Sequence, residues 1–176
     1  RAPQAGVIVL NWRFLVEQCP VGLIPFTRAI VSLGGCSASF VSPDGLIATN
    51  HHCVEGYLQY NSNAEVNRSR DGHTASDQAG ELSVGPSGRL YVLERIEDVT
   101  ERVQSRFKRR MSDAQRKEAL SLIRKEIVAE CEATPGYRCR VAGFYEGLSY
   151  RLVVSRELSD LRLVYAPPRS VGSYGG

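Results

Sequence analysis

The stretch that decides the fold runs from Gly34 to Cys53 and reads GGCSASFVSPDGLIATNHHC. Residues 37–41 alternate small or polar with apolar side chains, and residues 46–49 are apolar and prone to form a strand. Between them, residues 42–45 read Ser-Pro-Asp-Gly, which is typical of a turn. The pattern therefore predicts a β-hairpin whose second strand ends in Asn-His-His-Cys at residues 50–53.

Two cysteines lie at the open end of this predicted hairpin. Cys36 precedes the first strand and Cys53 follows the second, so the two face each other across the hairpin. A disulfide that closes a loop of this size stabilises a fold by about 3 kcal/mol in the chain-entropy description. We expect this bond to fix the backbone beside the two histidines.

The adjacent histidines His51 and His52 have three interpretations. As metal ligands they are disfavoured, because neighbours on a strand point to opposite faces and cannot both reach one ion; no metal site is expected. They could be a surface pair without a role. Alternatively, one of them is a catalytic base, since a strand end on a rigid scaffold can hold an imidazole against a nucleophile. A histidine without its partners does not decide between the last two.

Further segments extend the pattern along the chain. They are residues 29–36 (AIVSLGGC), 42–46 (SPDGL), 49–53 (TNHHC), 59–65 (QYNSNAE), 96–100 (IEDVT), 137–140 (YRCR), 160–168 (DLRLVYAPP) and 170–176 (SVGSYGG). Together they resemble the bacterial serine dipeptidyl peptidases, the family that includes dipeptidyl peptidases seven and eleven. The resemblance covers residues 29–176, which it identifies as the amino-terminal part of a peptidase domain.

The resemblance implies a mainly β, chymotrypsin-like double β-barrel, of which this chain holds the first part. The histidine before the cysteine is the general base in such enzymes, which maps onto His52 and leaves His51 as its neighbour. The triad aspartate and serine of the family lie in Thr-Gly-Asp-like and Gly-Asn-Ser-Gly-Ser-like segments. Neither segment occurs in this chain. We therefore expect these residues alone to be inactive.

The resemblance also implies what the complete enzyme acts on and where it works. Such enzymes release dipeptides from peptides with a free amino-terminus, they need no cofactor, and the full-length enzyme is expected to form a homodimer. The family is periplasmic or secreted. Two other hypotheses remain: a non-catalytic fragment or binding module, and a compact trypsin-like endopeptidase. The second is disfavoured, because a helical stretch at about residues 98–131 is foreign to a minimal double barrel.

Composition agrees with one ordinary globular core. The chain has 176 residues, 43% of them hydrophobic, and its formal charge of +3 is too small to argue for a nucleic-acid partner. Five cysteines are many for a cytosolic protein. Cys131 and Cys139 are expected to form a second disulfide, and Cys19 is left over.

Residues 1–28 do not match the family pattern and stay unassigned. They are apolar enough over residues 5–24 to suggest a signal peptide or a membrane segment, but Arg13 and Glu17 interrupt the run. No transmembrane helix is predicted.

The remaining chain contains a polar region and an inserted helical hairpin. Residues 61–87 read as a long loop, in which His73 is expected to be solvated. After a strand over residues 89–96, Asp98 is expected to be the N-cap of a first helix that includes Val99, Val103 and Phe107. The basic residues that follow read as a solvated face, because no aromatic stacking platform accompanies them.

A second helix begins with a capping box at Ser112 and Gln115. Its apolar stripe is Leu120, Ile123, Ile127 and Cys131. Strands are then expected over residues 137–144, 150–154 and 161–165. In the last, Leu161, Leu163 and Tyr165 are expected on one face, and the two prolines at 167 and 168 end the strand.

Overall fold

The computed structural model describes residues 8–11, 30–42 and 44–172. The predictions for residues 12–28, Cys19, Pro43 and 173–176 fall outside this range. The chain divides into two compact units, residues 1–92 with 158–176 and residues 93–157. The fold is mainly β, and its strands pair antiparallel. No helix in the described part of the chain is long and apolar enough to cross a membrane.

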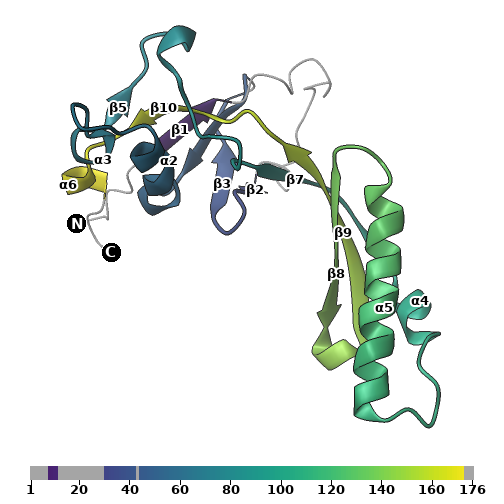
Figure 1. The fold of residues 1–176 in the computed structure, drawn as a ribbon. Helices are drawn as coiled ribbons and strands as arrows, with labels where there is room; N and C mark the ends of the chain where they lie inside the picture. Colours follow the sequence, from purple (N-terminus) through teal and green to yellow (C-terminus); the bar gives the residue numbers. More distant parts are fainter. Residues whose placement is uncertain (1–7, 12–29, 43, 173–176) are drawn as a thin grey trace, which may run out of the picture. The chain divides into compact units, whose positions relative to one another are not determined.

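The first unit is built on one sheet (Figure 1). Its strands follow the order β5 (His73–Thr74), β10 (Arg162–Ala166), β1 (Ile8–Asn11), β4 (Leu46–Thr49), β3 (Ser37–Phe40), β2 (Ile30–Ser32) and the start of β7 (Leu90–Asp98), and β6 (Leu82–Ser83) also pairs with β10. Strand β1 belongs to the segment that the sequence left unassigned. It lies between β4 and β10 and pairs with both.

The predicted hairpin is present as β3 and β4. The Val41 amide donates to the Leu46 carbonyl at 2.8 Å and so closes the turn. Gly45 has a φ of 87°, which explains why the turn needs a glycine there. The second strand ends at Thr49, earlier than expected, because residues His51–Cys53 form a short 3-10 helix, η1.

The hydrophobic core of the first unit packs against this sheet. Ile47 of β4 and Leu163 of β10 are fully buried there, together with Leu58 of the helix α2 (Glu55–Tyr60). Leu161 is buried as expected. Tyr165, however, is 39% exposed, so of the three alternating residues only Leu161 and Leu163 belong to the core.

Residues 61–87 are more structured than the predicted loop. They contain the helix α3 (Arg68–Asp71), the strands β5 and β6, and the 3-10 helix η2 (Gln78–Gly80). His73 is not solvated: it is 9% exposed, its Nε2 is 3.1 Å from the Gly80 carbonyl, and its Nδ1 is 3.3 Å from Arg68 Nη1. The backbone of His73 pairs with β10, and this pairing buries the side chain. The polar composition of the surrounding residues alone does not predict this burial.

His73 should make stability depend on pH. Its pKa lies below the usual value, first because burial disfavours the charged ring, and further because the Arg68 guanidinium repels it; the hydrogen bond to Gly80 opposes both effects. The unfolded chain therefore binds a proton before the folded one does, so stability should fall as the pH drops below about 6.5.

The control is His73→Gln, whose amide can still donate to Gly80 but cannot be protonated. We expect the melting temperature of the full-length wild type to fall more than that of His73→Gln between pH 7.5 and pH 5.5. Parallel decreases in the two proteins would contradict this assignment.

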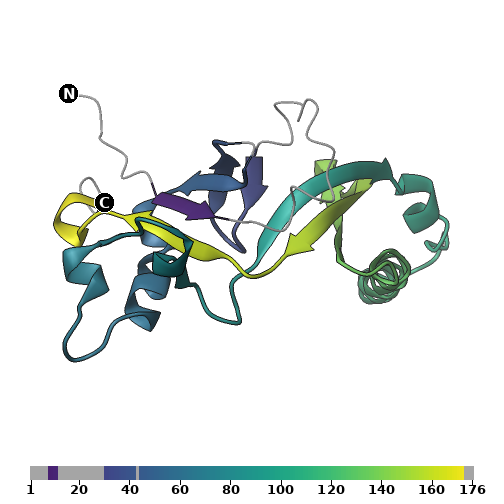
Figure 2. The same ribbon diagram turned by 90° about the horizontal axis from the view of Figure 1, so that it is seen from above.

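The second unit packs one long helix against three strands. Strands β7, β9 (Ser149–Leu158) and β8 (Tyr137–Phe144) are adjacent in that order. The helix α5 (Asp113–Glu132) contacts β8, and Figure 2 shows it nearly end-on, on one side of the strands. The capping box at Ser112 and Gln115 is confirmed, with both reciprocal hydrogen bonds formed.

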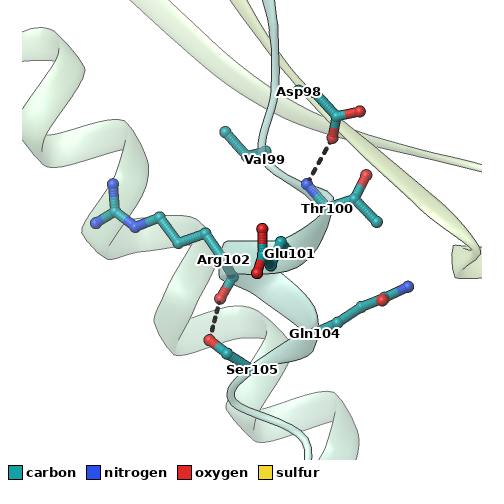
Figure 3. A pocket seen from close by; sticks show the side chains of 7 residues that line it. All are labelled: Asp98, Val99, Thr100, Glu101, Arg102, Gln104 and Ser105. Carbon is teal, nitrogen blue, oxygen red and sulfur yellow. Dashed lines mark hydrogen bonds between the residues drawn. The ribbon is translucent and has the colours of Figure 1, made fainter.

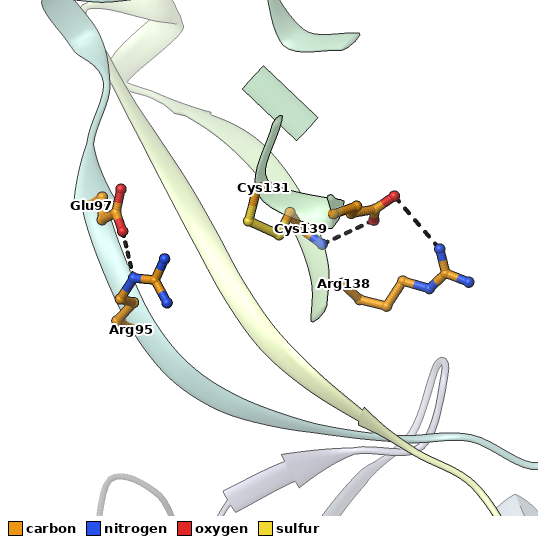
Figure 4. Close-up of a disulfide and its surroundings, with 6 residues drawn as sticks. Arg95, Glu97, Cys131, Arg138 and Cys139 are labelled. Carbon is orange, nitrogen blue, oxygen red and sulfur yellow. Dashed lines mark hydrogen bonds and ion pairs between the residues drawn. A yellow bond between two sulfur atoms is a disulfide. The ribbon is translucent and has the colours of Figure 1, made fainter. Parts of the chain in front are cut away.

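The core of the second unit contains the predicted helical stripe. Ile123 and Ile127 are buried, and Leu120 and Cys131 pack beside them. Cys131 is joined to Cys139 by a disulfide, which ties the end of α5 to β8 (Figure 4). The Cys139 amide also donates to Glu132 Oε1 at 3.1 Å, so covalent and hydrogen bonds fix the same junction.

The first helix of the insertion differs from its prediction. Helix α4 spans Thr100–Gln104, and Val99 occupies its N-cap position. Asp98 is the last residue of β7 instead, although its Oδ1 accepts a hydrogen bond from the Thr100 amide at 2.9 Å. Phe107 lies in the loop after the helix, and its side chain still packs against the core of the second unit. The helical hairpin is thus one short and one long helix.

Candidate functional site

The short helix η1 carries both histidines of the predicted site. The chain leaves β4 at Thr49, whose hydroxyl donates to the Ser37 carbonyl at 2.9 Å, and turns at once. The Val54 amide donates to the His51 carbonyl at 3.0 Å and closes one turn. Because a 3-10 helix has three residues per turn, neighbouring side chains point about 120° apart. His51 and Val54 therefore face the interior together, and both are buried.

His52 points away from the interior. Its side chain is exposed, and no hydrogen bond to it is formed by the residues that the structure describes. Its neighbour Cys53 is bonded to Cys36, with the two Cα atoms 6.0 Å apart, so the expected pair at the hairpin's open end is joined. The disulfide and the buried Val54 fix the backbone on the carboxyl side of His52 while the imidazole stays accessible.

The His51 ring has a different environment. It is 3% exposed, and its Nε2 lies 3.3 Å from the carbonyl oxygen of Pro167. Its Nδ1 has no hydrogen-bond partner among the described residues. A ring enclosed in this way cannot reach an external nucleophile. The family resemblance picks His52 as the base, and in the structure the two histidines differ in burial: His51 is enclosed and His52 is exposed.

The same turn contains the only group of potential metal ligands that the described residues bring together. One ring nitrogen of His52 and the sulfur atoms of Cys36 and Cys53 lie within 4.8 Å of one another. Zinc binds thiolates, however, and both sulfurs are part of the disulfide. In this oxidised form the donor set does not fit a zinc ion.

An open hollow in the second unit is a poorer candidate. It is lined by residues of α4 and the end of β7, including Asp98, Arg102 and Gln104 (Figure 3). Asp98 is held by the Thr100 amide and pairs with Arg151, and the Ser105 hydroxyl donates to the Arg102 carbonyl. These polar groups serve the local fold, and the hollow contains no nucleophile paired with a base.

Two basic residues of the insertion, Arg102 and Arg106, are paired with carboxylates of α5. Arg102 Nη2 lies 2.6 Å from Glu130 Oε1, and Arg106 Nη2 lies 2.8 Å from Glu126 Oε2, so two carboxylates of α5 balance them. Exposed pairs of this kind contribute little to stability. They do lower the net positive charge around α4.

Comparison with known proteins assigns the chain to a family. Residues 21–176 match the family described as Peptidase S46. The chain is 44% identical over 149 residues to an Asp/Glu-specific dipeptidyl-peptidase of Shewanella putrefaciens, and 39% identical over 152 residues to dipeptidyl-peptidase 7 of Capnocytophaga gingivalis. Each alignment covers 85% of this chain but 20% and 21% of the relative, so the chain spans about a fifth of their length.

Solved structures agree with this result. A crystal structure of Porphyromonas endodontalis DPP11 in complex with substrate superposes with a TM-score of 0.75 and 34% identity, over 90% of this chain and 24% of that one. A second, in complex with the dipeptide Arg-Glu, gives a TM-score of 0.72 and 31% identity, over 94% and 25%. On the family match and these relatives, the chain belongs to the peptidase S46 family.

Proposed function

We propose that the chain is the part of a serine dipeptidyl peptidase that carries the general base, His52. The observation that carries this proposal is the exposed His52 imidazole on a turn held by the Cys36–Cys53 disulfide. The relatives named as dipeptidyl peptidases support the reaction class. The resemblance to chymotrypsin-type enzymes suggests that the antiparallel sheet of the first unit forms part of a double β-barrel.

In this mechanism His52 is neutral at the start. It takes the proton from a serine hydroxyl as that oxygen attacks the scissile carbonyl, and then gives the proton to the leaving amine. The serine and the aspartate that orients the imidazole would come from outside these 176 residues. A base without nucleophile or oxyanion hole retains almost none of the triad's effect, so we expect no turnover from these residues alone.

The proposed substrates are peptides with a free amino-terminus, from which dipeptides are released. The DPP11 structure with the dipeptide Arg-Glu supports this substrate class. Relatives of both specificity names, Asp/Glu-specific and dipeptidyl-peptidase 7, match this chain, so the side-chain preference is left open. A periplasmic or secreted location and a homodimer of the full-length enzyme complete the proposal, and the two disulfides support an oxidising compartment.

The test uses the full-length enzyme and pairs of dipeptide reporters with a free or an acetylated amino-terminus. Because acetylation removes the charged hydrogen-bond donor, we expect it to lower kcat/KM by about 100-fold. A serine-directed fluorophosphonate should abolish hydrolysis of the free reporter. Equal hydrolysis of both reporters would exclude a dipeptidyl aminopeptidase and favour an endopeptidase, and resistance to the fluorophosphonate would exclude the serine mechanism.

A further inference from the structure

His51 is enclosed by a segment far away in the sequence. The segment Pro167–Gly172 follows β10 and contains the short helix α6 (Arg169–Gly172), which contacts η1. His51 Nε2 lies 3.3 Å from the Pro167 carbonyl oxygen. Because a carbonyl can only accept, Nε2 carries the proton and donates it. The buried His51 ring thus forms a directed bond between the turn of the proposed base and this segment.

Gly172 packs directly on the His51 ring. A Cβ atom at position 172 would lie 2.1 Å from His51 Cδ2 and 2.5 Å from Cγ, distances that no real contact permits. The Gly172 amide donates to the Pro168 carbonyl at 2.9 Å, which holds the backbone in this place. Glycine is therefore required at position 172 by the ring beneath it.

The other side of the segment is also fixed. A Cβ at Gly72 would lie 2.6 Å from the Ala166 carbonyl oxygen and 2.8 Å from the Pro168 nitrogen. The residues around Pro167 are therefore in close contact with both Gly72 and His51. An ion pair between Arg169 and Glu55, 3.3 Å apart and exposed at the arginine, adds little to this arrangement.

We propose that His51 is a positioning residue, which sets where the segment Pro167–Gly172 lies relative to His52. The inference rests on the proposed function of His52 as the base. His51 and His52 share one turn of η1, so the contacts that anchor the His51 ring also hold the backbone beside His52. A displacement of about 1 Å in a catalytic group can lower the rate by about 100-fold. His51 thus acts through its neighbour and touches no substrate.

A matched pair of variants tests the hydrogen bond in the full-length enzyme. The terminal amide of glutamine reaches the position of Nε2, whereas that of asparagine reaches only Nδ1, so His51→Gln can donate to Pro167 and His51→Asn cannot. We expect His51→Gln to keep kcat/KM within about 3-fold of the wild type and His51→Asn to lose about 10-fold or more, mainly in kcat. In both variants, kcat/KM should fall at the same acidic pH as in the wild type, since the proposed base His52 is retained.

Equal kcat/KM values for the two variants would overturn the proposal. So would a loss in His51→Asn that disappears once activity is divided by the folded fraction, because that would be a structural role alone. Loss of this acidic fall in kcat/KM in both variants would also overturn it, since His51 would then be the titrating base.

A double-mutant cycle tests the contact without using turnover. Gly172→Ala should lower the melting temperature in the wild type, because its Cβ meets the His51 ring, and should have little further effect in His51→Ala, where the ring is absent. Additive effects would mean that the two residues are not in contact, which overturns the inference. If the coupling is found but His52→Ala is fully active, the contact stands and the proposed function fails.

Discussion

Full-length enzyme with His52→Ala is expected to lose its peptidase activity, by about 10⁴-fold or more in kcat. The alanine cannot accept the proton of the attacking serine, and neither of the other two histidines in these 176 residues can replace it, because His51 and His73 are both buried. His52 itself is exposed, so its removal leaves the core unchanged, and the melting temperature should stay within a degree or two of the wild type. Kinetics with dipeptide reporters, together with thermal melts, measure both quantities.

Two further histidine variants serve as controls. His73→Gln changes the same residue type away from the η1 turn and should stay active. His51→Ala should be weakened much less than His52→Ala, since it displaces the base without removing it. An inactive His51→Ala beside an active His52→Ala would reverse the assignment, and an active His52→Ala would end the proposal that this residue is the base.

Gly72→Ala is expected to be strongly destabilising, by about 4 kcal/mol in the free energy of unfolding. Gly72 has φ 77° and ψ −169°, a conformation that only glycine adopts readily. The added Cβ would also lie within 3 Å of the backbone of Ala166 and Pro168, which cannot rotate away as a side chain could. The loss of stability therefore has two causes: backbone strain at position 72 and steric overlap of the new Cβ with the backbone of Ala166 and Pro168.

The matched control is Gly56→Ala in α2. A Cβ there has no neighbour within 4 Å, and alanine favours a helix more than glycine does, so this variant should be neutral or slightly stabilising. Melts and limited proteolysis of the full-length protein compare the two. Similar melting temperatures for both variants would show that the backbone at Gly72 relaxes and that Pro167 is not held in place from that side.

Local patterns predicted much of this fold. Alternation and turn residues located the β3–β4 hairpin, and the capping box at Ser112 located the start of α5, because contacts between residues close in the sequence determine these features. The strand Tyr137–Phe144 and both cysteine pairs also followed from local signals. His52 was singled out by its place before Cys53.

Long-range pairing accounts for what the sequence did not reveal. Strand β1 has four residues and no clear period, and it is defined only by its partners β4 and β10. His73 is buried because β5 pairs with β10, more than eighty residues later in the chain. The burial of His51 depends equally on Pro167 and Gly172. The proline pair marked the end of β10 and residues 170–176 carried part of the family resemblance, but neither signal predicted the contact with His51.

The position of β10 has a consequence for the order in which the chain folds. The second unit is one continuous stretch, residues 93–157, with a hairpin and a helix that pack on near neighbours, so it can fold without waiting for the rest of the chain. The sheet of the first unit must wait for residues 162–166, which β1, β5 and β6 all need as their partner. The turn that carries His52 can therefore form before β10 is in place. The segment that follows β10 then completes the surroundings of this turn.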